Sequence, residues 1–200
     1  MSDDRLASQL EFLLELDKAK MVIRRSYLTD GSRRENDAEH MWHLALFVLV
    51  LAEHADEPID VVRVLKMVLV HDIVEIDAGD TFLYDDHLRA SKVERELAAA
   101  ERLYGLLPGE QGAELRAIWE EFEAKSTPEA RFAASIDRLE PVLLNLANEG
   151  RTWREHGLTA DRVRQANAGI ADGSRRLGRY VADRLDGAVA AGYLSELPPD

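Results

Sequence analysis

Cysteine is absent from the sequence, and its absence removes several kinds of chemistry. None of the 200 residues is a cysteine, so disulfide bonds, thiolate nucleophiles and cysteine-ligated zinc or iron–sulfur sites are excluded. A metal site in this chain would therefore use the side chains of histidine, aspartate and glutamate.

Basic residues are also in short supply. Lysine and arginine together number 25, against 38 aspartates and glutamates, which gives a formal net charge of −13. Binding to DNA or RNA depends on a net basic surface, so a nucleic acid polymer is not expected as a partner. A small phosphate ester remains compatible with this charge, because it requires only a local basic pocket.

Long apolar segments are missing as well. The N-terminus reads Met-Ser-Asp-Asp-Arg and has no apolar signal-peptide core. The longest apolar runs are too short or too interrupted to span a bilayer. We therefore expect a cytoplasmic protein with no membrane partner.

Helical periodicity is what the sequence has in abundance. We predict an all-α chain, because no stretch alternates apolar and polar residues as a strand does, and we expect residues 150–157 to form a loop. No change of composition divides the chain, so one domain over residues 1–200 is expected. The predicted helices cover residues 4–22, 38–55, 60–77, 91–107, 110–125, 129–149 and, with interruptions at glycines, 159–190.

The helix predicted over residues 60–77 ends in ionisable groups. Asp60 is placed as its N-cap, and His71 lies within one turn of Glu75. Buried carboxylates are costly unless they are paired, hydrogen-bonded or bound to a cation. A metal explains them economically, and the alternative is that His71 and Asp72 cap the helix end. One stripe of this helix contains Val61, Leu65, Val68, Asp72 and Glu75.

Two other predicted helices each carry an ionisable residue on or beside an apolar face. The helix over 38–55 is apolar nearly all round, which predicts burial, and it holds His40 in its first turn. The helix over 129–149 holds Asp137 at the border of its apolar stripe, and Glu140 also interrupts that stripe. Taken alone, such a histidine is usually a satisfied core residue and such an aspartate a surface or ion-paired residue.

Four arginines lie close together after the first predicted helix, on either side of a turn expected at Asp30-Gly31. A guanidinium offers paired donors that match phosphate oxygens, so one or more of them is a candidate phosphate clamp. The alternative is a solvated basic loop whose arginines pair with surface acids. The four are Arg24, Arg25, Arg33 and Arg34.

Together, His40, His71-Asp72 and Asp137 form an H…HD…D pattern, and the chain resembles the HD-domain superfamily of metal-dependent phosphohydrolases. Residues 35–40 (ENDAEH), 71–80 (HDIVEIDAGD) and 119–137 are similar to the branch that holds the 5′-deoxynucleotidases. The resemblance covers roughly residues 8–157 and leaves about 158–197 as a helical extension. It implies an HD-domain helical bundle with a metal site between buried helices.

The resemblance also implies a ligand set for one divalent cation, with water filling the open positions. Imidazole and carboxylate ligands suit Mn, Co, Fe, Ni, Zn or Mg, so the ligands do not choose the ion. Dinuclear relatives use additional histidines, whereas His54, His87 and His156 are scattered here without that spacing. The implied ligands are His40, His71, Asp72 and Asp137.

Further site residues follow from their places near these ligands. Glu75 is the candidate general acid or base, because a carboxylate beside a metal can handle the proton of water or of the leaving oxygen. By resemblance, Arg25 contacts the substrate phosphate and Asp80 is an acid near the sugar, with a catalytic as well as a binding role. Arg33 is a candidate for the same pocket, and Arg24 cannot be separated from Arg25.

The function implied is that of a phosphomonoesterase acting on nucleoside 5′-monophosphates, with deoxynucleoside forms favoured. Ser26 stands where a bulky residue is expected after the clamp arginine, so base and sugar preference stay open. One alternative is a hydrolase of another phosphate ester, such as a nucleotide sugar, a triphosphate or a biosynthetic intermediate. Another is a non-catalytic module with a structural metal. Relatives form homodimers, and the apolar second helix together with the glycine-interrupted final helix suits self-association.

Overall fold

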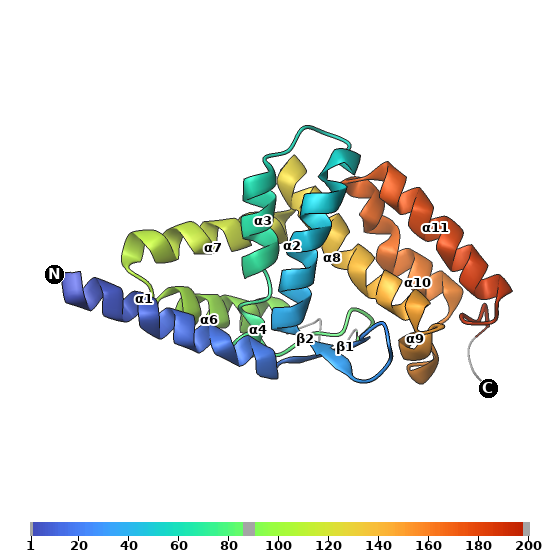
Figure 1. The fold of residues 1–200 in the computed structure, drawn as a ribbon, viewed down its shortest axis with the longest axis horizontal. Helices are drawn as coiled ribbons and strands as arrows, with labels where there is room; N and C mark the ends of the chain where they lie inside the picture. The colour runs from blue at the N-terminus through green and yellow to red at the C-terminus, as the bar shows by residue number, and fades with distance from the viewer. Residues whose placement is uncertain (1, 86–90, 198–200) are drawn as a thin grey trace.

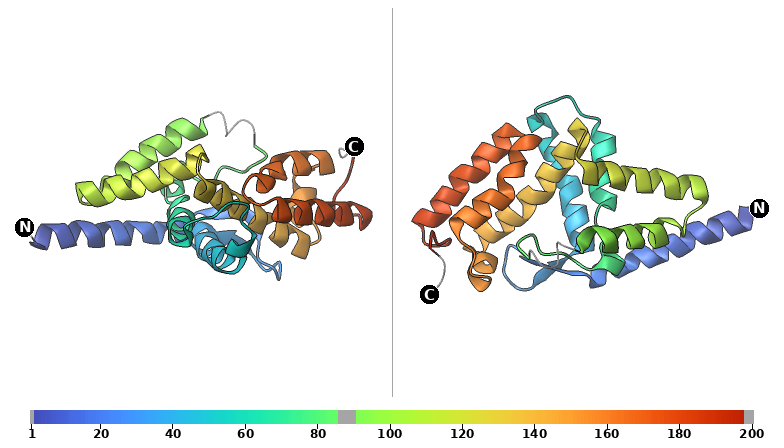
Figure 2. Two further views of the ribbon diagram at one scale, coloured as in Figure 1. Left: turned by 90° about the horizontal axis from the view of Figure 1, so that it is seen from above. Right: turned by 180° about the vertical axis from the view of Figure 1, so that it is seen from behind.

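The computed structural model describes residues 2–85 and 91–197. Helices predominate in these residues, so the prediction of an all-helical class is confirmed apart from one small sheet. Figure 1 shows an elongated molecule whose two chain ends lie at opposite extremities. Both views in Figure 2 keep α1 (Ser2–Leu16) at one extremity and α11 (Arg175–Ala190) at the other.

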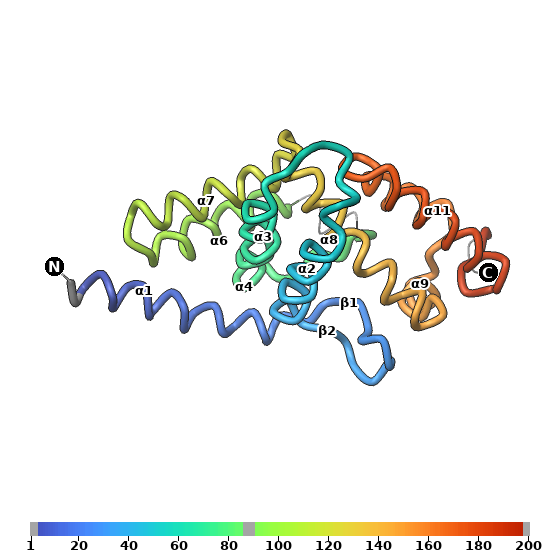
Figure 3. Tube along the Cα trace, turned by 45° about the horizontal axis from the view of Figure 1, so that its top comes forward, coloured from blue at the N-terminus to red at the C-terminus, as the bar shows by residue number. Residues whose placement is uncertain are grey.

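The first half of the chain builds one end and the centre of the molecule. Figure 3 shows α2 and α3 side by side at the centre, with α1 extending away from them. After α1 come a 3-10 turn, Asp17–Met21, then β1 (Ile23–Tyr27), β2 (Arg34–Asn36), α2 (Asp37–Leu51), a 3-10 turn at Ala52–His54, α3 (Val61–Val70) and α4 (Glu75–Ala78).

The second half supplies the remaining helices. The longest, α8, crosses the centre of the molecule and packs against α2, α3, α7 and α11. These elements are α6 (Lys92–Tyr104), α7 (Gly109–Ala124), α8 (Pro128–Ala147), α9 (Arg151–Glu155), α10 (Ala160–Asn167), a 3-10 turn at Ala168–Asp172, and α11.

The sheet is an antiparallel hairpin of β1 and β2, which the sequence did not predict. Ile23 pairs with Asn36 and Tyr27 with Arg34, with an irregularity between these pairs. The expected turn at Asp30-Gly31 lies between the strands, and Gly31 adopts a positive φ of 67° there. The prediction of no strand is wrong because backbone pairing of largely polar residues produces this hairpin without any apolar alternation.

The helix predicted over 60–77 begins as expected but does not continue to its predicted end. The Asp60 carboxylate accepts the Val62 and Arg63 backbone N–H groups, as an N-cap does. α3 ends at Val70, and residues 71–74 form a tight turn before α4. Backbone hydrogen bonds between residues three apart, rather than four apart as in an α-helix, close that turn. One of them runs from the Glu75 N–H to the Asp72 carbonyl at 3.0 Å.

α2 begins with a reciprocal cap. The Asn36 side chain accepts the Glu39 N–H, and the Glu39 carboxylate accepts the Asn36 N–H, so Asn36 is the N-cap and Asp37 the first helical residue. The expectation that this helix is buried all round is wrong. His40 is buried on its inner face, whereas Trp42 remains 61% exposed on its outer face.

α8 begins with residue types that favour a helix start. The Thr127 hydroxyl accepts the Ala130 N–H, and Pro128 occupies the first helical position, where its missing N–H has no consequence. Phe132, Ile136 and Leu139 of this helix are almost completely buried. This packing fixes the position of Asp137, which lies between Ile136 and Leu139 in sequence.

The C-terminal third differs from the prediction in two places. Residues 151–155 form α9 rather than a loop, and Trp153 of α9 is 1% exposed, so burial of this ring accounts for the extra helix. Gly178 lies inside α11 instead of interrupting it, because it packs closely against Ala171. The division into one domain with a core and a C-terminal extension stays a prediction.

None of the helices in residues 2–85 and 91–197 combines the length and the apolar character needed to cross a bilayer.

Candidate metal centre

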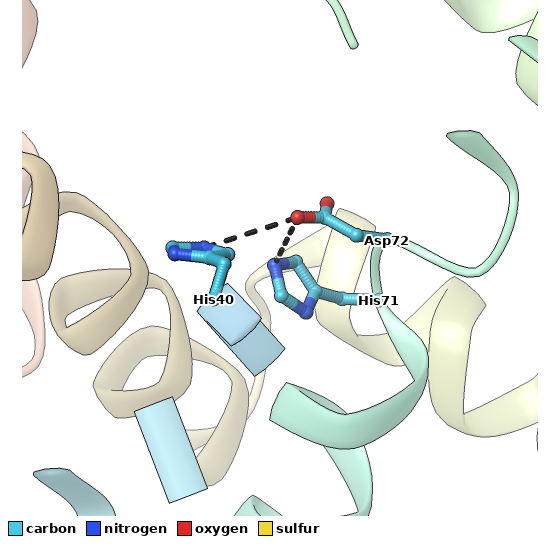
Figure 4. A group of neighbouring side chains, drawn as sticks. All are labelled: His40, His71 and Asp72. Carbon is cyan, nitrogen blue, oxygen red and sulfur yellow. Dashed lines mark ion pairs between the residues drawn. The ribbon is translucent and has the colours of Figure 1, made fainter. Parts of the chain in front are cut away.

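Two histidines and two aspartates from three separate segments converge at the centre of the molecule. His40 comes from α2, His71 and Asp72 from the turn after α3, and Asp137 from α8. His40 Nε2 lies 3.1 Å from Asp137 Oδ1 and 3.8 Å from Asp72 Oδ2. His71 Nε2 lies 3.2 Å from Asp72 Oδ2 and 3.5 Å from Asp137 Oδ1. Figure 4 shows three of these side chains pointing toward one another.

The unsatisfied atoms of this group fit a divalent cation. His71 Nε2 is buried and has no hydrogen-bond partner among the described residues. His71 Nδ1 lies 3.1 Å from the Val68 carbonyl, and donation to that oxygen leaves Nε2 as a free acceptor in the neutral ring. Two imidazole nitrogens and two carboxylates are a donor set that first-row divalent metals accept. The fold therefore brings suitable ligand atoms close to one another.

The electrostatics of the group are set by its burial and its opposite charges. Burial disfavours the charged form of His71, but the charge of Asp72 and its contact with Asp137 raise its pKa to about 10. Burial and Arg24 likewise oppose the charged form of His40, while contacts with Asp137 and Glu140 raise its pKa to about 9. In the absence of a cation, both imidazoles are therefore positively charged at neutral pH.

The ion-pair partners of Arg24 distinguish it from Arg25. The sequence alone could not make this distinction. The Nη1 atom of Arg24 lies 2.6 Å from Asp72 Oδ2 and 3.2 Å from Asp37 Oδ1. Burial opposes the charge of this guanidinium, but the charge of Asp72 holds its pKa well above the usual value. Both arginines line the adjacent cavity, but Arg24 is held against the candidate metal ligands, whereas Arg25 is exposed.

The cavity beside the ligands has a volume of about 180 Å³. Arg25, Glu75 and Asp80 line it together with His71, Asp72 and Asp137, so most of the predicted site residues share one space. Its wall also contains charged side chains of both signs and four aromatic rings: Arg24, Lys92, Glu96, Glu123, Lys125, Arg138, Phe82, Tyr84, Phe122 and Trp153.

Glu75 and Asp80 both lie where burial favours the neutral acid. Burial and the charges of Asp72 and Asp37 raise the pKa of Glu75 well above its ordinary value. Burial also raises the pKa of Asp80, although Arg24 opposes this effect. Glu75 Oε2 is buried without a hydrogen-bond partner in the described part of the chain. Glu75 can therefore hold a proton inside the cavity.

Arg33 is not brought to this cavity. Both of its Nη atoms bond the carboxylate of Glu39, at 2.8 and 2.6 Å, and the side chain is 54% exposed. Of the other histidines, His54 lies in the 3-10 turn after α2, and His156 follows α9, where its ring lies 4.6 Å from that of Phe82. His87 lies outside the described residues.

Two buried glutamates behind His40 were not singled out by the sequence. Glu140 Oε2 lies 3.3 Å and Glu35 Oε2 3.6 Å from His40 Nδ1. Burial and the charge of Glu140 raise the pKa of Glu35 to about 9, whereas contacts with His40 and His43 outweigh burial and lower that of Glu140. The available signal was Glu140 itself, an acid within an otherwise apolar stripe.

Comparisons with known proteins identify the family to which the chain is similar. The family described as HD domain matches residues 16–177. The bovine (Bos taurus) protein named 5′-deoxynucleotidase HDDC2 is 33% identical over 144 residues, which cover 72% of this chain and 69% of the relative. The human protein of the same name is 31% identical over 68% of this chain and 66% of its own length.

The fold of the chain is also similar to that of solved structures. The chain is similar to a protein from Magnetospirillum magnetotacticum, described as a predicted metal-dependent phosphohydrolase, with a TM-score of 0.93 and 52% identity over 98% of both chains. A Pyrococcus horikoshii protein, PH0347, shares the fold at a TM-score of 0.60 and 23% identity, covering 90% of this chain and 97% of that protein.

Proposed function

The chain belongs to the HD-domain family, and on that premise we propose that it is a metal-dependent phosphohydrolase of phosphomonoesters. We propose nucleoside 5′-monophosphates as its substrates, with deoxynucleoside forms favoured. The observation that carries the proposal is the convergence of His40, His71, Asp72 and Asp137 on one buried point beside a cavity. Relatives that bear the name 5′-deoxynucleotidase support the substrate class.

The proposed cofactor is one divalent ion held by these four side chains. Such an ion, when bound, supplies a Lewis acid for a phosphoryl oxygen and for the attacking water. The ligand atoms proposed for the histidines are the Nε2 atoms, because these face the two aspartates. Arg24 keeps Asp72 oriented through its ion pair at 2.6 Å.

The protein's own groups account for the rest of the reaction. Arg25 lines the cavity and offers a guanidinium to the phosphate oxygens. Glu75 keeps a proton because of its burial among like charges, so it can donate this proton to the leaving oxygen. Asp80 lies on the same wall and is proposed to bind a hydroxyl of the sugar.

Phosphate release from a panel of nucleoside monophosphates tests the proposal directly. The protein is loaded with Mn²⁺ or Co²⁺, metal occupancy is measured, and each substrate is assayed. Glu75→Ala should lose the activity while keeping the metal, and Glu53→Ala, on the exposed turn after α2, is the matched control. Silence across the panel at full occupancy would rule out the proposed substrates.

A second candidate substrate class is a nucleotide with more than one phosphate. Lys92 on the cavity wall is paired with Glu96 at 3.3 Å. Lys125 and Arg138 line the cavity in addition to Arg25 and are the groups that would meet further negative charge on a ligand. Triphosphates and nucleotide sugars therefore belong in the same panel. The retention of Glu75 beside all four proposed ligands counts against a non-catalytic metal-binding module.

Self-association is also proposed, as a homodimer. Leu10, Leu13 and Leu14 on α1 and Trp42 and Leu49 on α2 are all more than half exposed, which is unusual for large apolar side chains gathered on two helices. Light scattering at micromolar concentration tests the proposal, and a monomeric mass would contradict it. The cytoplasmic location stays a prediction.

A further inference from the structure

A cluster of buried charge lies against His40, and the proposed reaction does not use it. Glu140 is 0% and Glu35 2% exposed, and neither is among the described residues that line the cavity. Both carboxylates face Nδ1 of His40, which is the ring nitrogen opposite the one that faces Asp72 and Asp137. The ring of His40 therefore lies between the candidate metal centre and these two acids.

The atoms that face each other in this cluster are unsatisfied. His40 Nδ1, Glu35 Oε2 and Glu140 Oε2 are all buried, and none has a hydrogen-bond partner within residues 2–85 and 91–197. Nδ1 nevertheless lies 3.3 Å from Glu140 Oε2 and 3.6 Å from Glu35 Oε2. A small rotation of the ring or the carboxylate would close the shorter of these gaps into a hydrogen bond.

The second oxygen of Glu140 is already occupied. His43 Nδ1 donates to Glu140 Oε1 at 3.0 Å, and the His43 ring packs edge-on against Phe47 with ring centroids 4.7 Å apart. His43 is partly exposed, at 35%. It therefore holds Glu140 from the outer side and leaves Oε2 directed toward His40.

Metal ligation through Nε2 dictates what Nδ1 must do. A neutral imidazole carries one proton, so a ring that gives Nε2 to a metal keeps its proton on Nδ1. A buried N–H without an acceptor is costly, and histidine ligands generally donate this proton to a carboxylate or carbonyl. Glu140 Oε2 is the nearer of the two unpaired acceptors in reach of His40 Nδ1.

We propose that Glu140 is a positioning residue that accepts the Nδ1 proton of His40 and so holds Nε2 toward the metal. Glu35 Oε2 lies 3.6 Å from the same nitrogen and 3.6 Å from Arg24 Nε, and His43 fixes the orientation of Glu140. The inference rests on the proposed metal site. It assigns a purpose to a buried acid that otherwise only interrupts the core of α8.

Metal affinity of three variants tests the assignment without any assay of hydrolysis. Glu140→Leu removes the acceptor, and the apparent Kd for Co²⁺ should rise by about 10- to 100-fold, the usual effect of losing such a partner. Glu140→Gln keeps an acceptor oxygen and should restore nearly the affinity of the unaltered protein. Ser135→Ala is the control on the same helix, because its buried hydroxyl bonds the Arg131 carbonyl and the Gly173 N–H instead.

Two readings separate positioning from a merely structural role. The visible spectrum of bound Co²⁺ should change in Glu140→Leu and not in Ser135→Ala, with folding of the metal-free proteins checked by circular dichroism. In the unaltered protein loaded with Zn²⁺, ¹⁵N NMR should show His40 protonated at Nδ1, a measurement that needs no variant. Nδ1 ligation, or a folded Glu140→Leu with unchanged affinity, overturns the inference alone. Failure of the unaltered protein to bind any metal overturns the metal site as well.

Discussion

Arg24 Nη1 lies 2.6 Å from Asp72 Oδ2, so a proposed metal ligand is also the partner of a largely buried guanidinium. The same nitrogen lies 3.2 Å from Asp37 Oδ1. Arg24 therefore compensates a concentration of carboxylates that would repel one another without it.

Removal of this charge should destabilise the protein. Arg24→Ala leaves Asp72 and Asp37 without their cation, and breaking a buried ion pair in this way costs about 3–5 kcal/mol. Thermal unfolding of the metal-free protein measures the loss. The effect should shrink when a divalent ion is added, because the ion supplies positive charge to the same carboxylates. An unchanged melting temperature in the metal-free variant would contradict this account.

Its neighbour should behave differently. Arg25→Ala removes a proposed phosphate contact at the cavity wall, and loss of a hydrogen bond to a charged group is worth about 1.5–3 kcal/mol, or roughly a 10- to 100-fold rise in KM. Stability and metal content should stay the same. Arg33→Ala is the control, because Arg33 pairs with Glu39 outside the cavity. Equal effects of the two variants would remove the distinction drawn between these arginines.

Metal binding should release protons at neutral pH. The pKa values of His40 and His71 are raised from 6.5 to about 9 and about 10, so both rings are charged at pH 7 in the metal-free protein. A ligand imidazole must be neutral, and affinity should therefore increase with pH. Calorimetric titrations in buffers of different ionisation enthalpy count the protons released, and identical heats in all buffers would argue against the effect.

The same shifts set the pH dependence of stability. Because the folded-state pKa values of these histidines lie above their unfolded values, their contribution is full below about pH 6.5 and is lost as the pH rises through 9 and 10. The metal-free protein should thus melt at a lower temperature at pH 9.5 than at pH 6. Melting curves across this interval provide the check, and a rising melting temperature would refute it.

Chelation should remove activity and stability together. An ion that binds only the folded state stabilises it by about 2.7 kcal/mol at a free concentration of 100 times its Kd. Treatment with a chelator should lower the melting temperature, and Mn²⁺ or Co²⁺ should restore it. Elemental analysis should find one ion per chain. A ratio of two would disprove the single-ion proposal and direct attention to Asp37, Asp72 and Glu75, whose carboxylates also lie close together.

Local signals in the sequence were sufficient for several features of the fold. The Thr127-Pro128 start of α8 and the Asp60 cap of α3 depend on side-chain-to-backbone bonds between near neighbours, so residue type alone predicts them. The choice of Asn36 over Asp37 as the cap of α2 was not predictable in this way. Two residues that are able to cap stand side by side, and the buried pairing of Asp37 with Arg24 decides between them.

Long-range contacts decided the features that the sequence did not reveal. The hairpin of β1 and β2 forms without apolar alternation, and the break after Val70 has neither glycine nor proline to mark it. Glu140 looked like an interruption of a core stripe, because its partners His40 and His43 lie 97 residues or more before it in sequence. The resemblance to a family grouped the four proposed ligands, but the surrounding acids required coordinates.

The tight turn after α3 ties a proposed ligand to the proposed acid. The backbone N–H of Glu75 donates to the carbonyl of Asp72. A proposed metal ligand and the proposed acid therefore belong to the same short turn. A cation of another radius that draws Asp72 inward would carry Glu75 with it. Exchange of one ion for another should then alter turnover as well as affinity.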